Sequence, residues 1–131
     1  MPACSSGTQT INLDCNSKLV SVTASAQSSG QQSVSIKDSN GETVFQANGA
    51  SSSGGNFTII GQGTFVTSGN GNYTVELTGG SGILSDESAA VYNGAPYLHA
   101  YTFATNDGGC SAGDRDFNDL VVSIIEFKNK G

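Results

Sequence analysis

Six residues at positions 114–119, Asp-Arg-Asp-Phe-Asn-Asp, carry a high density of oxygen ligands. They include three of the eleven acidic residues, and Asp107 lies a few positions upstream. Two carboxylates about 6 Å apart repel each other by roughly 3 kcal/mol at an effective dielectric constant near 20, and Arg115 is the only basic side chain nearby. A hard divalent cation would relieve this repulsion, because Ca²⁺ accepts roughly six to eight oxygen ligands in flexible geometry. The segment therefore predicts a calcium site.

Other interpretations of this segment fit less well. Asp114, Asp116 and Asn118 match the first, third and fifth positions of an EF-hand loop, but Asp119 occupies the position that needs glycine and Ile125 the one that needs a bidentate acid. A zinc site is not indicated, since no Cys-His spacing exists. A solvated acidic turn is the plainest alternative. It is disfavoured because an apolar run typical of a buried strand, residues 120–125, follows at once.

The composition indicates a β-protein. Charged residues make up 12% of the chain, and glycine, serine, threonine, asparagine and glutamine are abundant. Helices would prefer Ala, Leu, Glu and Lys, and no window shows the apolar i, i+3, i+4, i+7 pattern of an amphipathic helix. We therefore expect residues 1–131 to form one all-β domain, an antiparallel β-sandwich of about nine strands with Greek-key connections.

Runs of β-forming residues bounded by turn signals predict eight or nine strands. They are expected at 8–13, 18–26, 34–37, 43–47, 57–60 continuing into 61–66, 73–78, 97–103 and 120–127, with a short irregular strand beginning at 83. The first two are expected to pair as a hairpin, and Asn40-Gly41 predicts a second hairpin. Asp86 and Glu87 are expected in a solvated turn. His99, the single histidine, is expected to be a strand residue and not a metal ligand.

Charge and hydropathy limit the partners. The net charge of −6 and the pI near 4.3 argue against nucleic acid, whose phosphates select basic surfaces, and suit a chain that binds cations. No apolar run approaches the roughly 20 residues of a membrane span, and the N-terminus shows no signal peptide. These features predict a soluble protein that is cytoplasmic or released to the cell surface or extracellular space.

The three cysteines leave at least one thiol unpaired. A Cys4–Cys15 bridge could staple the first predicted hairpin, whereas in the cytosol all three would stay reduced. Cys110 precedes the acidic segment, so it could be a bystander or could link that loop to another cysteine.

Three segments resemble one known family. They are residues 22–34, the Asn-Gly-Glu-Thr of 40–43, and the Asp-x-Asp-Phe-Asn-Asp-Leu-Val-Val of 114–122. In this order and separation they resemble the calcium-mediated fucose/mannose-binding lectins, the LecB-like bacterial lectins. The resemblance implies a nine-stranded sandwich, a homodimer or homotetramer, and a monosaccharide bound through two adjacent Ca²⁺ ions.

The resemblance also implies roles for individual residues. Asp116 and Asp119 would bridge both ions, the backbone carbonyl of Gln27 would bind one of them, and either Asn106 or Asp107 would replace an acidic ligand of the family. The implied metal ligands are Asp114, Asp116, Asn118, Asp119, Asp107, Asn106, Gln27 and a C-terminal Gly131 near the partner's site. The implied sugar contacts are Ser28, Ser29, Gly30, Asp107, Asp114, Asp116, Asn118 and Asp119.

The function expected from these features is calcium-dependent binding of glycans of the fucose or mannose type, without enzymatic activity. Two alternatives are a β-sandwich that calcium merely stabilises, for adhesion or structure, and a metal-dependent hydrolase. The hydrolase is disfavoured because no second, isolated acid in an apolar setting offers the raised pKa of a general acid. The preferred sugar is left open.

Overall fold

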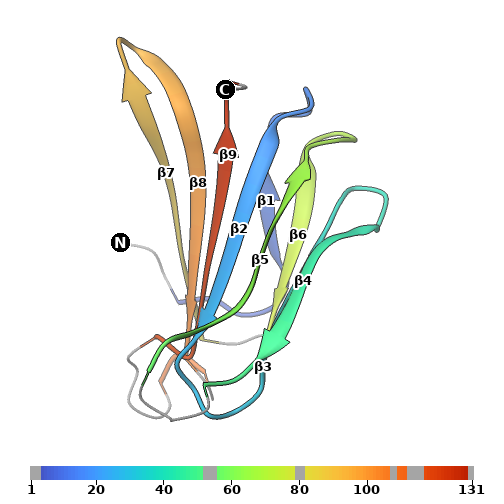
Figure 1. Ribbon diagram of the computed structural model, residues 1–131. Coiled ribbons are helices and arrows are strands. Elements are labelled where there is room, and N and C mark those ends of the chain that lie inside the picture. The colour runs from blue at the N-terminus through green and yellow to red at the C-terminus, as the bar shows by residue number, and fades with distance from the viewer. Residues whose placement is uncertain (1–3, 52–55, 79–81, 107–108, 112–116, 130–131) are drawn as a thin grey trace.

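The computed structural model describes residues 4–51, 56–78, 82–106, 109–111 and 117–129. Within them the chain forms nine strands in two antiparallel sheets, which confirms the predicted all-β sandwich (Figure 1). One sheet has the order β1-β6-β3-β4 and the other β5-β2-β9-β8-β7. The strands are β1 Gln9–Asn12, β2 Leu19–Ala26, β3 Gln32–Lys37, β4 Thr43–Gly49, β5 Thr58–Val66, β6 Asn72–Leu77, β7 Ile83–Tyr92, β8 Ala95–Thr105 and β9 Leu120–Phe127.

The core forms between the sheets because side chains alternate along each strand. In β2, the side chains of Val20, Val22 and Ala24 are buried and those between them are partly exposed. In β9, Leu120, Val122 and Ile124 follow the same rule. The facing sheet contributes buried residues from all four of its strands, namely Ile11, Val34, Ile36, Phe45, Ala47, Tyr73, Val75 and Leu77.

The hairpin predicted at Asn40-Gly41 is confirmed, since β3 pairs with β4 across it. The carboxylate of Asp38 accepts hydrogen bonds from the backbone N–H groups of Asn40 and Glu42, both at 2.9 Å. Gly41 takes a positive φ of 82°, which glycine adopts without a steric cost.

The predicted hairpin between the first two strands is wrong. β1 pairs with β6, whereas β2 pairs with β5 and β9 in the other sheet. The turn at 13–18 therefore carries the chain from one sheet to the other. Both strands have a buried face, with Ile11 1% and Val20 0% exposed, and they place these side chains in the same core from its two sides.

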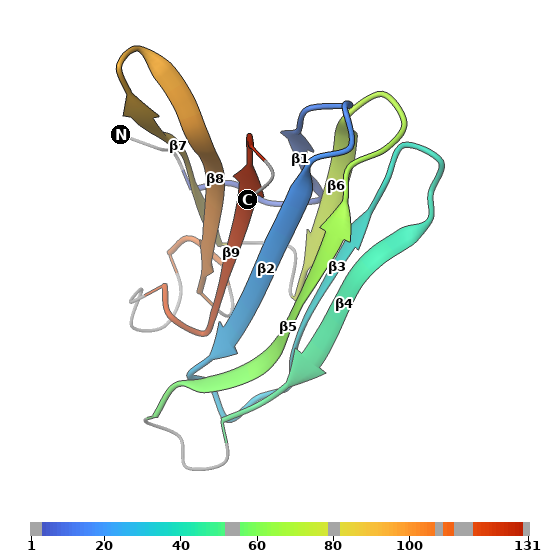
Figure 2. The ribbon, with the colours of Figure 1, turned by 45° about the horizontal axis from the view of Figure 1, so that its top comes forward.

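The solvated turn predicted at Asp86 and Glu87 is also wrong, because both lie within the long strand β7. The turn lies at Asn93 and Gly94, both with positive φ, which is the two-residue connection typical of a tight hairpin. The β7–β8 hairpin forms one edge of the sandwich (Figures 1 and 2). The consecutive runs 57–60 and 61–66 form one strand, β5.

The cysteines pair as Cys4–Cys110, with the two Cα atoms 5.9 Å apart, and Cys15 is free and exposed. Of the alternatives left open, the link from Cys110 to another cysteine is therefore confirmed, and the Cys4–Cys15 bridge is wrong. The pairing follows from the path of the N-terminal segment, in which Ser5 forms a bridge with Ile83 at the start of β7. No helix in the described ranges is long and apolar enough to cross a membrane.

Candidate functional site

Three neighbouring strands of the five-stranded sheet bring predicted ligands to one end of the sandwich (Figure 1). Leu120, the first residue of β9, is opposite Ala26 at the end of β2 and Thr105 at the end of β8. Gln27 and Asn106 follow those two ends, and Asp119 precedes the start of β9. Residues far apart in the chain therefore meet because the three strands are in register.

Backbone hydrogen bonds extend this pairing into the loops. The Gln27 N–H donates to the Asp119 carbonyl at 3.3 Å, and the Asp119 N–H donates to the Thr105 carbonyl at 3.1 Å. Phe117, two residues before Asp119, has a positive φ of 55°, which is unusual for a residue with a side chain. Asn118 and Asp119 are half-buried. The chain thus turns sharply just before two of the predicted calcium ligands.

Asn106 is fixed by several hydrogen bonds and is only 2% exposed. Its backbone N–H donates to the Gly82 carbonyl at 2.9 Å, and its carbonyl accepts from the Gly109 N–H at 3.3 Å. The Asn106 side-chain amide donates to the Gly109 carbonyl at 2.8 Å. The predicted ligand therefore lies in a small, closed turn and not on a solvated loop.

The turn at 28–30, predicted to contact sugar, directly follows Gln27. The Gly30 N–H donates to the Ser28 hydroxyl oxygen at 3.0 Å, and the Ser28 carbonyl accepts from the Ser51 N–H at 2.8 Å. Ser29 and Gly30 are exposed. The turn is thus held at one residue and presents its other two to solvent.

The chemistry of these groups fits a hard cation. Asn106, Asn118 and Asp119 offer carboxylate and amide oxygens, which are the donors that Ca²⁺ prefers. In addition, the Thr105 hydroxyl is buried, and no hydrogen-bond partner for it lies among the described residues. The described part of the chain contains no group of three or more His, Cys, Asp or Glu side chains that could hold a metal. Asp107, Asp114, Asp116 and Gly131 lie outside the described residues, so their assigned roles stay predictions.

A second polar cluster, which sequence reasoning missed, lies toward the opposite end of β9. The Glu126 carboxylate is fully buried and accepts from the Asp14 backbone N–H at 2.6 Å and from Lys128 Nζ at 2.8 Å. Nδ1 of His99 lies 3.3 Å from Glu126, and its Nε2 lies 2.7 Å from Glu87. We call these groups the Glu126 cluster. They join β7, β8 and β9.

Two pKa values shift in and beside this cluster. The hydrogen bond from His99 lowers the pKa of the Glu87 carboxyl, with a smaller contribution from Tyr101. Burial raises the pKa of the Tyr101 phenol, whose hydroxyl also exchanges hydrogen bonds with the backbone of Asn12 at 3.1 Å. His99 thus lies in β8, as expected of a strand residue, and is engaged by two carboxylates within the cluster.

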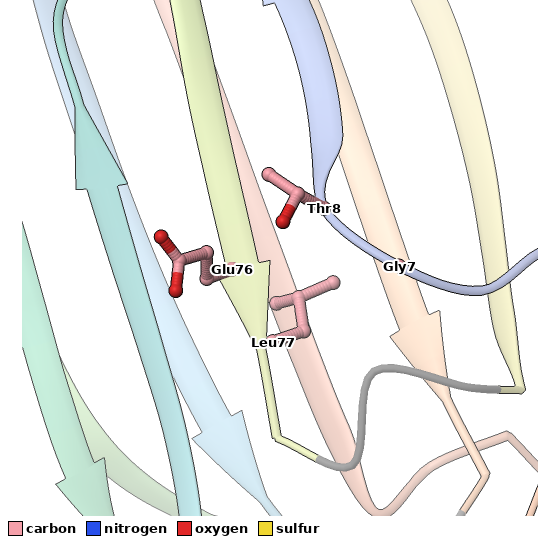
Figure 3. A pocket seen from close by; sticks show the side chains of 4 residues that line it. All are labelled: Gly7, Thr8, Glu76 and Leu77. Carbon is pink, nitrogen blue, oxygen red and sulfur yellow. The ribbon is translucent and has the colours of Figure 1, made fainter.

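A small hollow lies between β1 and β6, lined by Gly7, Thr8, Glu76 and Leu77 (Figure 3). Among these described lining residues Glu76 is the only charged one, and Nζ of Lys37 lies 3.6 Å from the Glu76 carboxylate. Because it lacks a set of converging donors, this hollow is a poorer candidate than the ends of β2, β8 and β9.

The chain is similar to several known proteins. It is 51% identical over 126 residues to thrombocorticin of Corticium sp., an alignment covering 93% of this chain and 95% of that protein. Among solved structures, the high-affinity mannose-binding lectin of Ralstonia solanacearum has a TM-score of 0.68 at 19% identity, covering 93% of this chain and 96% of that one. A Chromobacterium violaceum lectin in complex with alpha-methyl-fucoside has a TM-score of 0.66 at 24% identity, with the same coverage. At these identities the structures show the fold alone.

The model of the family described as fucose-binding lectin II (PA-IIL) matches residues 3–128, nearly the whole chain. This match confirms the resemblance inferred from segments 22–34, 40–43 and 114–122. The chain therefore belongs to the fucose-binding lectin II (PA-IIL) family.

Proposed function

We propose that residues 1–131 form one calcium-dependent lectin domain that binds glycans of the fucose or mannose type through two Ca²⁺ ions. The observation that carries this proposal is the convergence of Gln27, Asn106 and Asp119 at the aligned ends of β2, β8 and β9. A group of oxygen donors from three separate segments, in a lectin family, suits a cation that holds a sugar.

Family membership makes this chain a carbohydrate-binding protein and not an enzyme, as expected from the sequence. The specific sugars and the calcium dependence belong to the proposal. Mannose stands in the description of the Ralstonia solanacearum lectin, and fucose in the name of the family and in the ligand of the Chromobacterium violaceum lectin. Both sugars are therefore the first to test on this chain.

In the proposed site the ions are held by the carboxylates and amides of the acidic segment and by the neighbouring loop ends. The proposed ligands are Asp114, Asp116, Asn118, Asp119, Asp107, Asn106, the carbonyl of Gln27 and the partner's C-terminal Gly131. Bound Ca²⁺ supplies open coordination positions that sugar hydroxyl oxygens can fill. The carboxylates accept hydrogen bonds from the same hydroxyls, and such charge-assisted bonds are about twice as strong as neutral ones.

Ser28, Ser29 and Gly30 are proposed to set sugar preference. The Ser51–Ser28 backbone bond and the Ser28–Gly30 bond fix the turn beside Gln27, so Ser29 and Gly30 are presented to solvent in a defined conformation. A pre-formed turn loses little entropy when a sugar binds it. Preference then depends on which sugar substituents fit against the turn while the vicinal hydroxyls reach the ions.

A homodimer or homotetramer is part of the proposal. The outer face of the five-stranded sheet supports it, because the outward positions of β5, β2, β9 and β8 carry no charged residue. Depletion of charge is typical of the centre of a protein interface. In the proposed assembly this face packs against a second copy and brings Gly131 near the partner's site.

Isothermal titration calorimetry with methyl fucoside and methyl mannoside, in calcium and in EDTA, tests the proposal. We expect binding of these sugars in calcium and none in EDTA. At a sugar concentration of about 100 times Kd, ligand linkage would stabilise the fold by about 2.7 kcal/mol. A calcium-dependent rise in Tm with no further rise on adding any sugar would instead indicate a calcium-stabilised structural module and refute the proposed function.

A further inference from the structure

We propose that the Cys4–Cys110 disulfide is a positioning element of the sugar site: it holds the turn containing Asn106 ready for calcium, so reducing it weakens calcium binding. This inference rests on the proposed function. It concerns a group that we call the Cys4–Cys110 corner, made of Cys4, Ser5, Gly82, Ile83, Asn106, Gly109 and Cys110.

The N-terminal side of the corner is attached to the start of β7. The Ser5 N–H donates to the Ile83 carbonyl at 2.8 Å, and the Ile83 N–H donates to the Ser5 carbonyl at 2.9 Å. Ile83 is fully buried in the core. Cys4, next to Ser5, is therefore tied to a fixed part of the sheet.

The other side of the corner is the turn of Asn106. Asn106 is joined to Gly82 through its N–H and to Gly109 through its carbonyl and its side-chain amide. Cys110 follows Gly109 directly, so the disulfide attaches this turn to the segment that is already fixed by Ile83. The path from Cys4 through Ile83, Gly82, Asn106 and Gly109 to Cys110 is thus closed by a covalent bond.

The packing within the corner leaves little room for movement. A Cβ on Gly82 would lie 2.5 Å from the Asn106 carbonyl oxygen and 2.8 Å from the Gly109 carbonyl carbon. Gly82 also has a positive φ of 67°. The backbone of the turn therefore packs directly against Gly82, the residue before β7, and a small displacement of either segment moves Asn106.

The consequence for calcium is one of pre-organisation. A ligand whose turn is already ordered loses less conformational entropy on binding than one that must be ordered by the ion. With the disulfide intact, Asn106 is held before calcium arrives. When a dithiol reduces the bond, the S–S bond breaks, Cys4 and Cys110 become two thiols, and the dithiol is oxidised to its cyclic disulfide. The turn then keeps only its hydrogen bonds.

The test compares a Cys4→Ser/Cys110→Ser double variant with the matched control Cys15→Ser, which removes the free, exposed thiol. Calorimetric titration with CaCl₂ is expected to show at least tenfold weaker calcium binding for the double variant and a change of less than twofold for the control. At saturating calcium the double variant should recover sugar affinity within about threefold of wild type, because the sugar contacts themselves are unchanged.

A second measurement needs no calcium. Amide hydrogen exchange in calcium-free protein should be at least tenfold faster at the Asn106 and Gly109 N–H groups of the double variant, with the β2 amides unchanged. By reciprocity of linkage, calcium should make the disulfide harder to reduce. Each tenfold loss of calcium affinity on reduction corresponds to a shift of about 30 mV in the reduction potential.

Unchanged calcium affinity and unchanged exchange in the double variant would overturn the inference, even if its Tm fell. If the double variant does not fold, Gly82→Ala replaces it, with Gly94→Ala as control. Both glycines have positive φ, but an added Cβ at Gly94 meets nothing within 4 Å. Equal calcium affinities of these two variants would refute the inference. If wild-type protein binds no calcium, the proposed function and this inference are both refuted. If wild type binds calcium and changes in the Cys4–Cys110 corner leave the calcium affinity unchanged, the inference alone is refuted.

Discussion

The change Glu126→Gln tests how the far end of the sandwich is held together. Glu126 is fully buried, and its carboxylate faces the Lys128 ammonium at 2.8 Å, His99 at 3.3 Å and the Asp14 N–H at 2.6 Å. Glutamine has nearly the same shape, but it has no charge, and one of its two acceptor atoms becomes a donor. The substitution therefore leaves the partly buried Lys128 ammonium without its counter-charge and creates almost no cavity.

The expected cost follows from the number of charged bonds that are weakened. Hydrogen bonds to charged groups contribute about 1.5–3 kcal/mol each and neutral ones about 0.5–1.5 kcal/mol. Removing one partner of a buried ion pair typically costs about 3–5 kcal/mol, and glutamine retains one acceptor. We expect Glu126→Gln to lower the free energy of unfolding by about 3 kcal/mol, or Tm by roughly 10 °C for a chain of this size.

Urea unfolding followed by circular dichroism measures this cost, and Glu76→Gln is the matched control. Glu76 pairs with Lys37 at 3.6 Å, but the two side chains are 53% and 41% exposed, so their ion pair should contribute less than about 1 kcal/mol. Calcium and sugar affinities of Glu126→Gln should equal those of wild type, because six residues of strand place it about 20 Å from the start of β9. A cost within 1 kcal/mol of the control would refute the reasoning.

Further predictions concern the site, the interface and pH. Asp119→Ala should lower calcium affinity in calorimetry at least a hundredfold, while Asp86→Ala, on the exposed strand β7, should leave it unchanged. Ser123→Lys, on the outer face of β9, should shift the protein to monomers in light scattering, unlike Ser35→Lys on the other sheet. Because burial raises the pKa of Tyr101, its contribution to stability is present below the ordinary value of 10.0 and is lost as pH rises through the folded-state pKa. Urea unfolding between pH 9 and 11 should therefore show a steeper loss for wild type than for Tyr101→Phe.

The sequence predicts strands well where one face is buried. The alternation in β2 and β9 gives their positions because Val20, Val22, Val122 and Ile124 line the core. Alternation does not identify the partner of a strand, and for this reason the predicted pairing of β1 with β2 is wrong. The type of a buried residue does not indicate which of the two sheets it belongs to.

The strand β7 is missed over most of its length because its residues from 86 to 92 are exposed and show no alternation. Its presence depends on pairing with β8, which periodicity within one segment cannot reveal. One local signal was available, since Asn93-Gly94 is a strong indicator of a two-residue hairpin. Glu126 gave no such signal, because its burial depends on Lys128, His99 and the Asp14 backbone, which come from three parts of the chain.

For the candidate site, the resemblance to a lectin family supplied what spacing could not. Acidic density alone pointed to residues 114–119, but nothing in the residues links Gln27 or Asn106 to them until β2, β8 and β9 are aligned. A link from Cys110 to another cysteine was among the alternatives, but the sequence does not select its partner, because the choice is made by the bridge between Ser5 and Ile83.

The two ends of β9 therefore differ in how they are stabilised. At the Glu126 end, the buried Glu126 carboxylate is bonded by Lys128, His99 and the Asp14 N–H of the chain itself, so this end needs no ligand. In the site proposed at the Asp119 end, the ligand carboxylates carry charge of one sign, and a bound cation would relieve their mutual repulsion. The Cys4–Cys110 bond lies at the second end, where covalent closure can hold part of the site in order while calcium is absent. The Glu126 end keeps the fold stable without calcium. The order of the Asp119 end can therefore depend on bound calcium without unfolding the domain.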